Sequence, residues 1–355
     1  MFPIQIKPDE AVKELVEFNQ KVMRGIESIA DVREIDVAPT PKELVFQEDK
    51  CVLYHYTPRT ETPCRVPIVI VYALVNRPYM VDIQEGRSMV QNLLNLGMDV
   101  YLIDWGYADR GDMFLTMDDY INGYLDGCID VVRERHGLEA VNVLGICQGG
   151  TFSLCYAALH PEKVKNLITM VTPVDFDTRD GLLNIWSRFV DVDAMVNALG
   201  NVPGDFMNGG FLMLKPFQLM AQKYVGFLST IDQEQSLRSF LRMEKWIFDS
   251  PDQVGETYRQ FVKEFFQENK LIKGEVEIGG HKVDLKNVTM PVLNVFATED
   301  HLVPPASSEV LERHVGSTDV TTISFKGGHI GIYVSGRAQK ELAPALAEWV
   351  RSRSE

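Results

Sequence analysis

The stretch that decides the fold is Val141-Asn142-Val143-Leu144-Gly145-Ile146-Cys147-Gln148-Gly149-Gly150. Its first part is the apolar run of a buried strand, and residues 148–160 predict a helix. Only a very tight turn, with Cys147 at its tip, joins the two. Gly145 and Gly149 fit such a turn, because side chains two positions before and two after the nucleophile would collide there. The stretch therefore predicts a nucleophile on a sharp strand-to-helix turn.

Further strands and helices alternate on both sides of this stretch. Strand-like runs lie at 51–56, Pro67–Leu74, Asp99–Asp104, Asn166–Val171, Pro291–Ala297 and Val320–Phe325. Segments 82–96, 117–136 and 148–160 predict the intervening helices, and Gln339–Arg351 predicts a closing one. The central runs lack polar alternation, as expected when helices cover both faces of a parallel sheet. We therefore predict an α/β fold with a mostly parallel, doubly wound sheet.

The alternation stops after Pro173. Residues 177–287 are rich in Phe, Leu, Met and Trp and have helical periodicity at 234–248 and 258–266, which predicts an inserted, largely helical cap. We expect an N-terminal amphipathic helix and linker at 1–40, a core formed by 41–176 and 288–355, and the cap at 177–287. For the helix at 10–32 we favour packing on its own domain over docking to a partner. For Phe211–Phe217 we favour cap core over a channel or partner surface.

Two later strands end in the partners that a nucleophile needs. Asn294–Ala297 continues into Asp300, and Phe325 is followed by Lys326-Gly327-Gly328-His329. The order nucleophile, acid, histidine is that of α/β-hydrolases, so we predict that fold. His329 would accept the proton of Cys147, and Asp300 would orient the imidazole. All three lie at the carboxyl ends of strands, where open α/β sheets collect their ligands.

The same turn predicts an oxyanion hole. The helix that begins at Gln148 places its N-terminal dipole beside the sulfur, and the Gln148 N–H can donate to an oxyanion. A second donor is expected after the third strand, at Leu74 or Val75.

Three other residues near these motifs have competing interpretations. His301 adjoins Asp300, but we favour it as a loop residue that lines the site over the base, because Gly327-Gly328-His329 fits the turn after a strand better. Asp104 also ends a strand, but as the acid it would break the chain order. For Trp246 we favour cap packing over a position above the active-site pocket.

Composition excludes several classes of protein. The 355 residues include 35 Lys and Arg against 50 Asp and Glu, a net charge of −15, which argues against nucleic-acid binding. A polyanionic substrate would need a local basic patch. The five cysteines show neither a CxxC pair nor zinc-like spacing, so we expect no disulfide framework and no metal. Residues 1–10 lack signal-peptide features and no apolar run approaches about 20 residues. We therefore expect a cytoplasmic protein without a transmembrane segment.

Several motifs resemble the catalytic subunit of a poly(3-hydroxyalkanoate) synthase. They are Gly145–Gly150, Tyr72-Ala73-Leu74-Val75-Asn76-Arg77-Pro78-Tyr79, Tyr101–Gly106, Phe240–Phe248 and Gly327–His329. The resemblance covers nearly the whole chain, and the short length resembles the class III enzymes. It implies that 3-hydroxyacyl-CoA, chiefly (R)-3-hydroxybutyryl-CoA, is converted into polyester and free CoA without a bound cofactor. It also implies a homodimer, a second, dissimilar synthase subunit and association with the polyester granule surface.

The resemblance assigns roles to the same three residues. Cys147 would carry the acyl group, His329 would be the base, and Asp300 would either complete the triad or act on the 3-hydroxyl of the bound acyl unit. A thiol suits this role, because attack on a thioester yields another thioester that stays activated. The alternatives are a thioesterase, a cysteine hydrolase like dienelactone hydrolase, and a non-catalytic protein that binds a lipid or a partner on a granule.

Overall fold

The computed structural model describes residues 34–228 and 230–354, together with Lys13, Val16, Glu17, Gln20 and Met23. Most of the amphipathic helix expected at 10–32 lies outside the described residues. Among the described helices, none combines the length and apolar character needed to cross a membrane.

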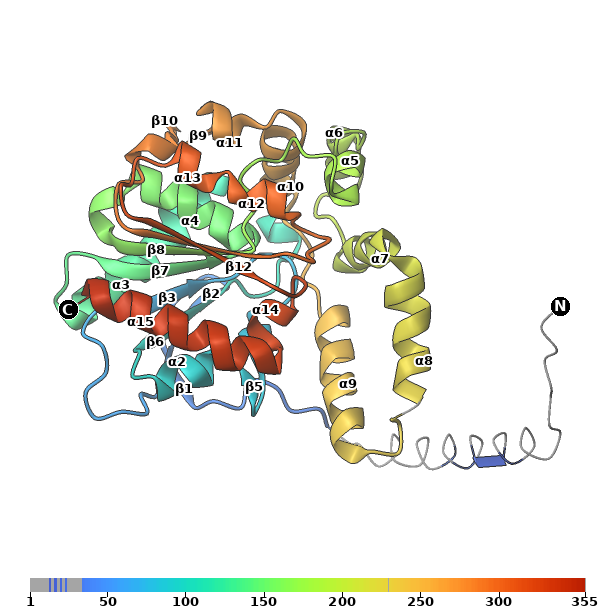
Figure 1. Cartoon of the computed structure of the whole chain (residues 1–355). Helices are drawn as coiled ribbons and strands as arrows, with labels where there is room; N and C mark the ends of the chain where they lie inside the picture. The colour runs from blue at the N-terminus through green and yellow to red at the C-terminus, as the bar shows by residue number, and fades with distance from the viewer. Residues whose placement is uncertain are drawn as a thin grey trace.

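A twisted sheet forms the centre of the molecule (Figure 1). Its eight strands within the described residues are ordered β1 (Lys42–Glu48), β2 (Cys51–Tyr56), β6 (Val100–Asp104), β3 (Ile68–Val71), β7 (Val141–Ile146), β8 (Val164–Met170), β11 (Val292–Ala297) and β12 (Val320–Phe325). Neighbours from β6 to β12 are parallel, whereas β2 is antiparallel to both of its neighbours. The predicted mostly parallel sheet is confirmed. The strands β3, β7 and β11 are buried throughout, which explains why their sequences are apolar except for the buried Asn142 and Asn294.

Two predictions about local structure were wrong. The edge strand β1 was missed, because its sequence Lys-Glu-Leu-Val-Phe-Gln-Glu is polar at both ends and partly exposed throughout. The predicted helix at 82–96 begins instead as a hairpin of β4 (Asp82–Gln84) and β5 (Arg87–Ser88), and helix α2 spans only Met89–Asn95. Gly86 turns the hairpin with a φ of 73°, and the Ser88 hydroxyl caps α2 by accepting from the Gln91 N–H.

Helices cover both faces of the sheet. On one face, α2 and α15 (Ala343–Ser354) share an apolar cluster with α14 (Gly331–Val334) and the π-helical turn Ala338–Leu342. On the other face, α3 (Asp126–His136) and α4 (Gln148–Leu159) pack with the π-helical turn Asp119–Leu125. The short helices α12 (Pro305–Glu309) and α13 (Leu311–His314) connect β11 to β12.

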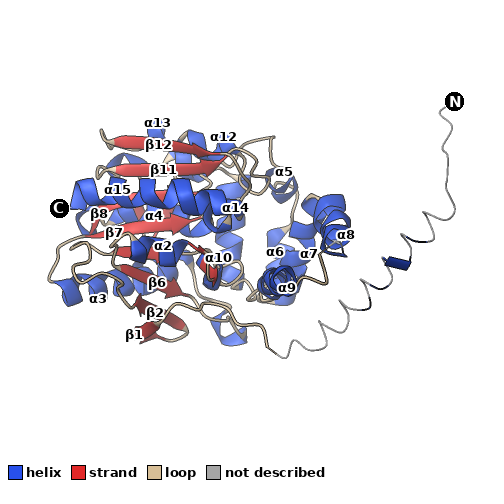
Figure 2. Cartoon of the chain, turned by 60° about the horizontal axis from the view of Figure 1, so that its bottom comes forward, coloured by secondary structure: helices blue, strands red, loops and turns tan. Residues whose placement is uncertain are grey.

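The segment between β8 and β11 is largely helical, with the following helices: α5 (Leu182–Ser187), α6 (Val192–Leu199), α7 (Gly204–Leu214), α8 (Lys223–Leu228), α9 (Glu234–Phe248), α10 (Gly255–Gln260) and α11 (Lys270–Lys273). Figure 2 shows α7, α8 and α9 beyond the ends toward which the strand arrows point. In contrast, α10, α11 and the short hairpin of β9 (Glu277–Ile278) and β10 (His281–Lys282) belong to the second half of the segment. Phe261, Phe265, Leu271 and Ile278 there pack in the same cluster as the sheet. Within the predicted cap at 177–287, the first helices thus lie beyond the ends of the strands and the later ones pack against the sheet. The boundaries of the cap stay a prediction.

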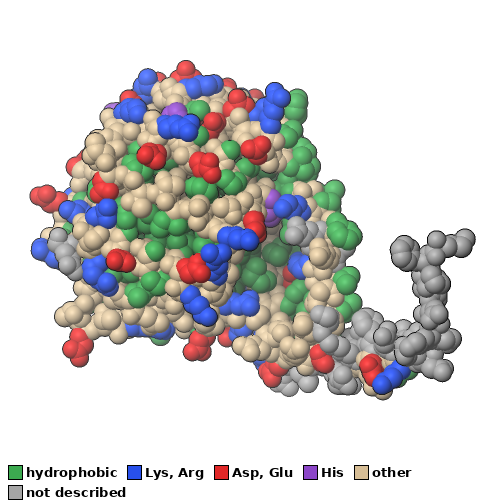
Figure 3. Space-filling view, in the orientation of Figure 1, with side chains coloured by type: hydrophobic (Ala, Val, Ile, Leu, Met, Phe, Trp, Pro, Cys, Tyr) green, Lys and Arg blue, Asp and Glu red, His purple; other side chains and the backbone are tan. Residues whose placement is uncertain are grey.

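Hydrophobic side chains remain exposed on the first helices of this segment. Figure 3 shows such side chains along the edge of the molecule where α5 to α8 lie. The most exposed are Phe189 at 84%, Phe217 at 76% and Val225 at 68%. Isolated exposed apolar residues are ordinary, but a group of this size on neighbouring helices is typical of an interaction surface.

Candidate active site

Cys147 stands between the last residue of β7 and the first residue of α4, as predicted. Its backbone angles are φ 54° and ψ −124°, a combination that L-residues rarely adopt. Two hydrogen bonds hold it there, since the Cys147 N–H donates to Met170 O (2.9 Å) and the Gly150 N–H donates to Cys147 O (2.9 Å). A strained nucleophile on a sharp turn presents its side chain above the sheet edge.

The two glycines that flank this turn are required by close backbone contacts. A Cβ atom at Gly145 would lie 2.5 Å from Gly150 Cα, and one at Gly149 would lie 2.3 Å from Val71 O. Both distances are shorter than real Cβ contacts. The steric reason inferred from the sequence is therefore present in the structure.

Asp300 and His329 form a buried pair. Asp300 lies in the loop after β11, His329 lies in the loop after β12, and His329 Nδ1 is 2.6 Å from Asp300 Oδ2. The other carboxylate oxygen of Asp300 accepts from the N–H groups of Leu302 (2.8 Å) and Val303 (3.0 Å). The side chain of Asp300 is 0% exposed and that of His329 is 6% exposed. These bonds fix the carboxylate and leave Nε2 as the imidazole nitrogen available to a nucleophile.

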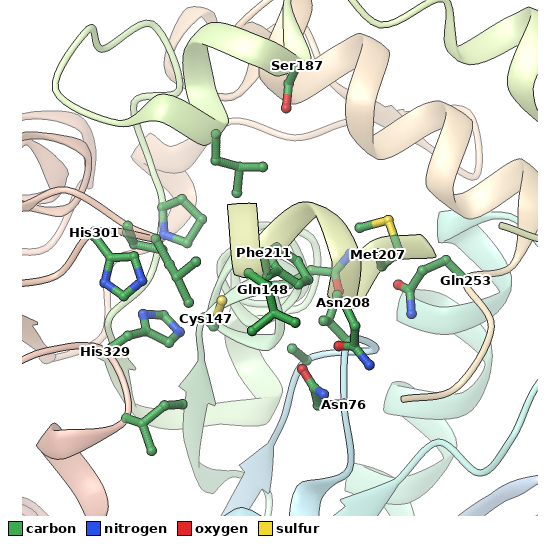
Figure 4. Close-up of a pocket in the computed structure, with 18 of the residues that line it drawn as sticks. Asn76, Cys147, Gln148, Ser187, Met207, Asn208, Phe211, Gln253, His301 and His329 are labelled. Atoms are coloured by element: carbon green, nitrogen blue, oxygen red, sulfur yellow. The ribbon is translucent and has the colours of Figure 1, made fainter. Parts of the chain in front are cut away.

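The imidazole lies beside the sulfur of Cys147 (Figure 4). Burial disfavours the charged imidazolium, but attraction to Asp300 and Cys147 and hydrogen bonds to both outweigh that penalty. The pKa of His329 is therefore raised, to about 10. A histidine with a raised pKa beside a thiol is suited to take the proton of that thiol and hold it while the sulfur attacks.

The structure places the two competing residues in other roles. Asp104 Oδ2 is 2.7 Å from Arg77 Nη2, and its other oxygen accepts from the Gly106 N–H (2.9 Å). His301 lines the cavity near His329, where burial and then the charge of Lys215 lower its pKa. A neutral His301 on the cavity wall agrees with the interpretation as a lining residue.

The two candidates for the second oxyanion donor differ. The Leu74 N–H already donates to Gln148 Oε1 (3.1 Å), so Leu74 is corrected from an oxyanion donor to a structural contact. Val75 lines the cavity, so its N–H stays the candidate for the second oxyanion donor. Gln148 lines the cavity too, and as the first residue of α4 its N–H has no intrahelical acceptor. The sequence did not predict that the Gln148 side chain fastens the loop at Leu74.

A cavity of about 370 Å³ opens above Cys147 and His329, and its walls are largely apolar. The helices after β8 contribute many of the lining residues, among them Leu183, Met207, Phe211, Leu212, Met243 and Trp246. Trp246 packs in the core as well, is 8% exposed, and donates from Nε1 to Arg77 O (2.8 Å). Phe211 and Leu212 line the cavity whereas Phe217 is on the surface, so the stretch 211–217 is not uniformly cap core.

Comparisons with known proteins agree with this geometry. A family model described as alpha/beta hydrolase fold matches residues 66–335, and one described as the N-terminus of poly-beta-hydroxybutyrate polymerase (PhaC) matches residues 19–93. The poly(3-hydroxyalkanoate) polymerase subunit PhaC of Allochromatium vinosum is 56% identical over 99% of this chain and 100% of its own length. The chain belongs to the poly(3-hydroxyalkanoate) polymerase PhaC family. The subunit of the same name from Thiocystis violacea is 55% identical over the whole of both chains.

Members of this family are acyltransferases, and so is this chain. Solved structures support the fold alone. The crystal structure of a carboxyl esterase from Bacillus coagulans is similar with a TM-score of 0.57 at 14% identity, covering 89% of this chain and 98% of that one. A monoacylglycerol lipase from Paleococcus ferrophilus gives a TM-score of 0.53 at 18% identity, covering 82% and 96%. The predicted α/β-hydrolase fold is confirmed.

Proposed function

We propose that this polymerase converts 3-hydroxyacyl-CoA, chiefly (R)-3-hydroxybutyryl-CoA, into polyester and free CoA through a thioester on Cys147. One observation carries the proposal: Cys147 lies on a strained turn beside the buried Asp300–His329 pair, at the base of an apolar cavity. The 56% identity to a named poly(3-hydroxyalkanoate) polymerase subunit supports the substrate class.

In the first step the proton of Cys147 moves to His329 Nε2, and the sulfur attacks the thioester carbonyl carbon. The N–H groups of Gln148 and Val75 would stabilise the negative oxygen of the tetrahedral intermediate. The bond from carbon to the CoA sulfur then breaks, and the CoA thiolate takes the proton from His329. The products are free CoA and an acyl group on Cys147.

In the second step a hydroxyl group attacks that acyl group. His329 takes the hydroxyl proton, a new ester bond forms, and the bond between carbon and Cys147 Sγ breaks. The sulfur leaves as thiolate and regains its proton from His329, so the cycle balances. Apolar walls such as Phe211 and Met243 favour attack by a hydroxyl of the substrate over water, whose attack would end chain growth.

The contacts of Asp300 support one of its two suggested roles. Both carboxylate oxygens are engaged, by His329 on one side and by the N–H groups of Leu302 and Val303 on the other. The side chain is fully buried. Orientation of the imidazole fits this environment better than direct contact with the 3-hydroxyl of a substrate.

The same proposal includes partners and location. The relatives are named as polymerase subunits, which supports a second, dissimilar subunit. A homodimer of this chain is also part of the proposal. The exposed apolar side chains of Phe189, Phe217 and Val225 would contact a partner or the surface of a polyester granule. The mechanism requires no cofactor other than the CoA of the substrate.

The direct test is incubation with 3-hydroxybutyryl-CoA, alone and with the cognate second subunit, while CoA release and polymer are both measured. Polymer together with CoA supports the proposal, and CoA with only free 3-hydroxybutyrate would establish a thioesterase instead. Cys147→Ala should abolish turnover while the protein stays folded. The matched control is Cys155→Ala, which changes a fully buried thiol in α4, the helix that follows Cys147, and should keep turnover. Unchanged activity in Cys147→Ala would refute the assignment.

A further inference from the structure

Asn76 has an unusual conformation beside the nucleophile. Its φ is 61°, in the left-handed region that Asn tolerates better than other residues with side chains, and it is 9% exposed. It follows the oxyanion candidate Val75 directly and lines the same cavity. Figure 4 shows Asn76, Asn208 and Gln253 together on one side of Cys147.

The amide of Asn76 points at the end of helix α9. Its Nδ2 lies 2.5 Å from Ser250 Oγ, 3.3 Å from Trp246 O and 3.4 Å from Ile247 O. The first contact is a short hydrogen bond to a hydroxyl. The other two acceptors are carbonyls in the last turn of the helix, where carbonyls lack intrahelical partners. Asn208 also donates from Nδ2 to Ile247 O (2.6 Å), so two amide side chains cap the carboxyl end of α9, and of these two only Asn76 belongs to the loop after Val75.

Other bonds reinforce this connection. Gln253 Nε2 donates to Leu74 O (3.2 Å), and Trp246 Nε1 donates to Arg77 O (2.8 Å). Segment 246–253 thus contacts the loop 73–77, which we call the oxyanion loop, at three of its residues. These contacts are distinct from the Asp300–His329 pair.

The opposite side of the oxyanion loop is bound to the nucleophile turn, because the Leu74 N–H donates to Gln148 Oε1. The loop is therefore held between the residue after Cys147 and the end of a cap helix. An oxyanion donor works only when its N–H is aimed at the developing charge, and a displacement of about 1 Å can cost roughly 10²-fold in rate. The position of the Val75 N–H thus depends on both attachments.

We propose that Asn76 is a positioning residue that ties the carboxyl end of α9 to the oxyanion loop, so that the Val75 donor is aligned only while this end of the cap is docked. The inference rests on the proposed function, since it concerns acyl transfer at Cys147. Asn76 acts on the rate through the backbone of Val75 and holds no proton of the reaction.

The test uses the full chain and compares Asn76→Gly with wild type. Glycine adopts the same positive φ without strain, so this variant removes the amide and keeps the backbone conformation. We expect kcat for CoA release from 3-hydroxybutyryl-CoA to fall about 10- to 100-fold, with KM changed less than about threefold. Alkylation of Cys147 by iodoacetamide should proceed at the wild-type rate, because His329 and Asp300 are untouched.

Two further variants separate positioning from general damage. Asn76→Asp keeps the shape but turns a carboxylate acceptor toward the carbonyls of Trp246 and Ile247, where the amide had placed a donor. The value of kcat should therefore fall at least as far as in Asn76→Gly. Ser250→Ala removes the shortest bond from a residue that does not line the cavity, so a smaller fall in kcat is expected at constant KM.

The outcomes are distinct. A kcat in Asn76→Gly within twofold of wild type overturns the inference. Slower alkylation of Cys147 together with a changed KM also overturns it, because that result would indicate a merely structural role for Asn76. Cys147→Ala separates this failure from that of the proposed function. If Cys147→Ala is inactive while Asn76→Gly is fully active, only the role of Asn76 fails. If Cys147→Ala keeps its turnover, the proposed function itself fails.

Discussion

Replacing Asp300 with Asn tests the buried pair without changing its size. The structure fixes how the new amide would be oriented. One oxygen position of Asp300 accepts from the N–H groups of Leu302 and Val303, so the amide oxygen of Asn must occupy it. The Nδ2 group then faces His329 and donates to Nδ1. This places the imidazole proton on Nε2, the nitrogen that has to accept the proton of Cys147.

The expected loss follows from that tautomer. The corresponding change in a serine protease triad costs about 10⁴ in kcat. We expect kcat/KM for 3-hydroxybutyryl-CoA to fall about 10³- to 10⁴-fold, which is about 4 to 5.5 kcal/mol of transition-state stabilisation. The two bonds to the backbone persist, but the free energy of unfolding at neutral pH should fall, because the charge of Asp300 is the largest attraction that raises the pKa of His329.

The assay follows loss of the thioester absorbance at several substrate concentrations, and nitrogen NMR of the imidazole reports the tautomer directly. Asp104→Asn is the matched control, since it changes the other acid at a strand end, which pairs with Arg77. It should lose less than about tenfold if the triad acid is Asp300. An Asp300→Asn enzyme within tenfold of wild type, or one with the proton still on Nδ1, would refute the reasoning.

Three further predictions concern the turn, the thiols and pH. Gly149→Ala should lower the free energy of unfolding in urea by about 1–3 kcal/mol or more, because its Cβ would meet Val71 O at 2.3 Å. Gly210→Ala, in α7 with no atom within 4 Å, should raise it by about 0.5–1 kcal/mol, and equal effects would contradict the steric argument. Iodoacetamide followed by peptide mapping should modify Cys147 at least about tenfold faster than Cys155, whose pKa is raised by burial, and equal rates would count against activation. The raised pKa of His329, about 10, means that the folded chain keeps a proton that the unfolded chain loses near pH 6.5. The free energy of unfolding should therefore fall as pH rises from about 6.5 through 10, and a His329→Gln variant that falls as steeply would contradict the assignment.

The sequence predicted most of the sheet because buried parallel strands are continuous apolar runs. Strands β2, β7 and β12 begin and end where the sequence placed them. The edge strand β1 escaped prediction because an edge needs no apolar face of that kind. The hairpin before α2 escaped for another reason. It depends on the buried carboxylate of Asp82, which accepts hydrogen bonds from Ser88 and from Thr40. Thr40 lies far from Asp82 in the sequence, so no local pattern predicts that contact.

For the site, chain order alone brought Asp300 and His329 together, because the carboxyl ends of neighbouring parallel strands share one edge. Asp300 pairs with His329 rather than with His301 because of the directions in which these side chains point. The only sign of this in the sequence was the pair of glycines before His329. The bond from Leu74 to Gln148 and the left-handed conformation of Asn76 had no signal in the sequence. Both depend on contacts between segments more than 70 residues apart.

The spread of the triad along the chain has a consequence for biosynthesis. Cys147 and its turn can form once β3 and β7 have left the ribosome and paired, but His329 follows β12, the last strand of the sheet to be synthesised. A growing chain that has already buried its first strands therefore carries a thiol without a base. The thiol therefore gains its base only after β12 has been synthesised and has joined the sheet.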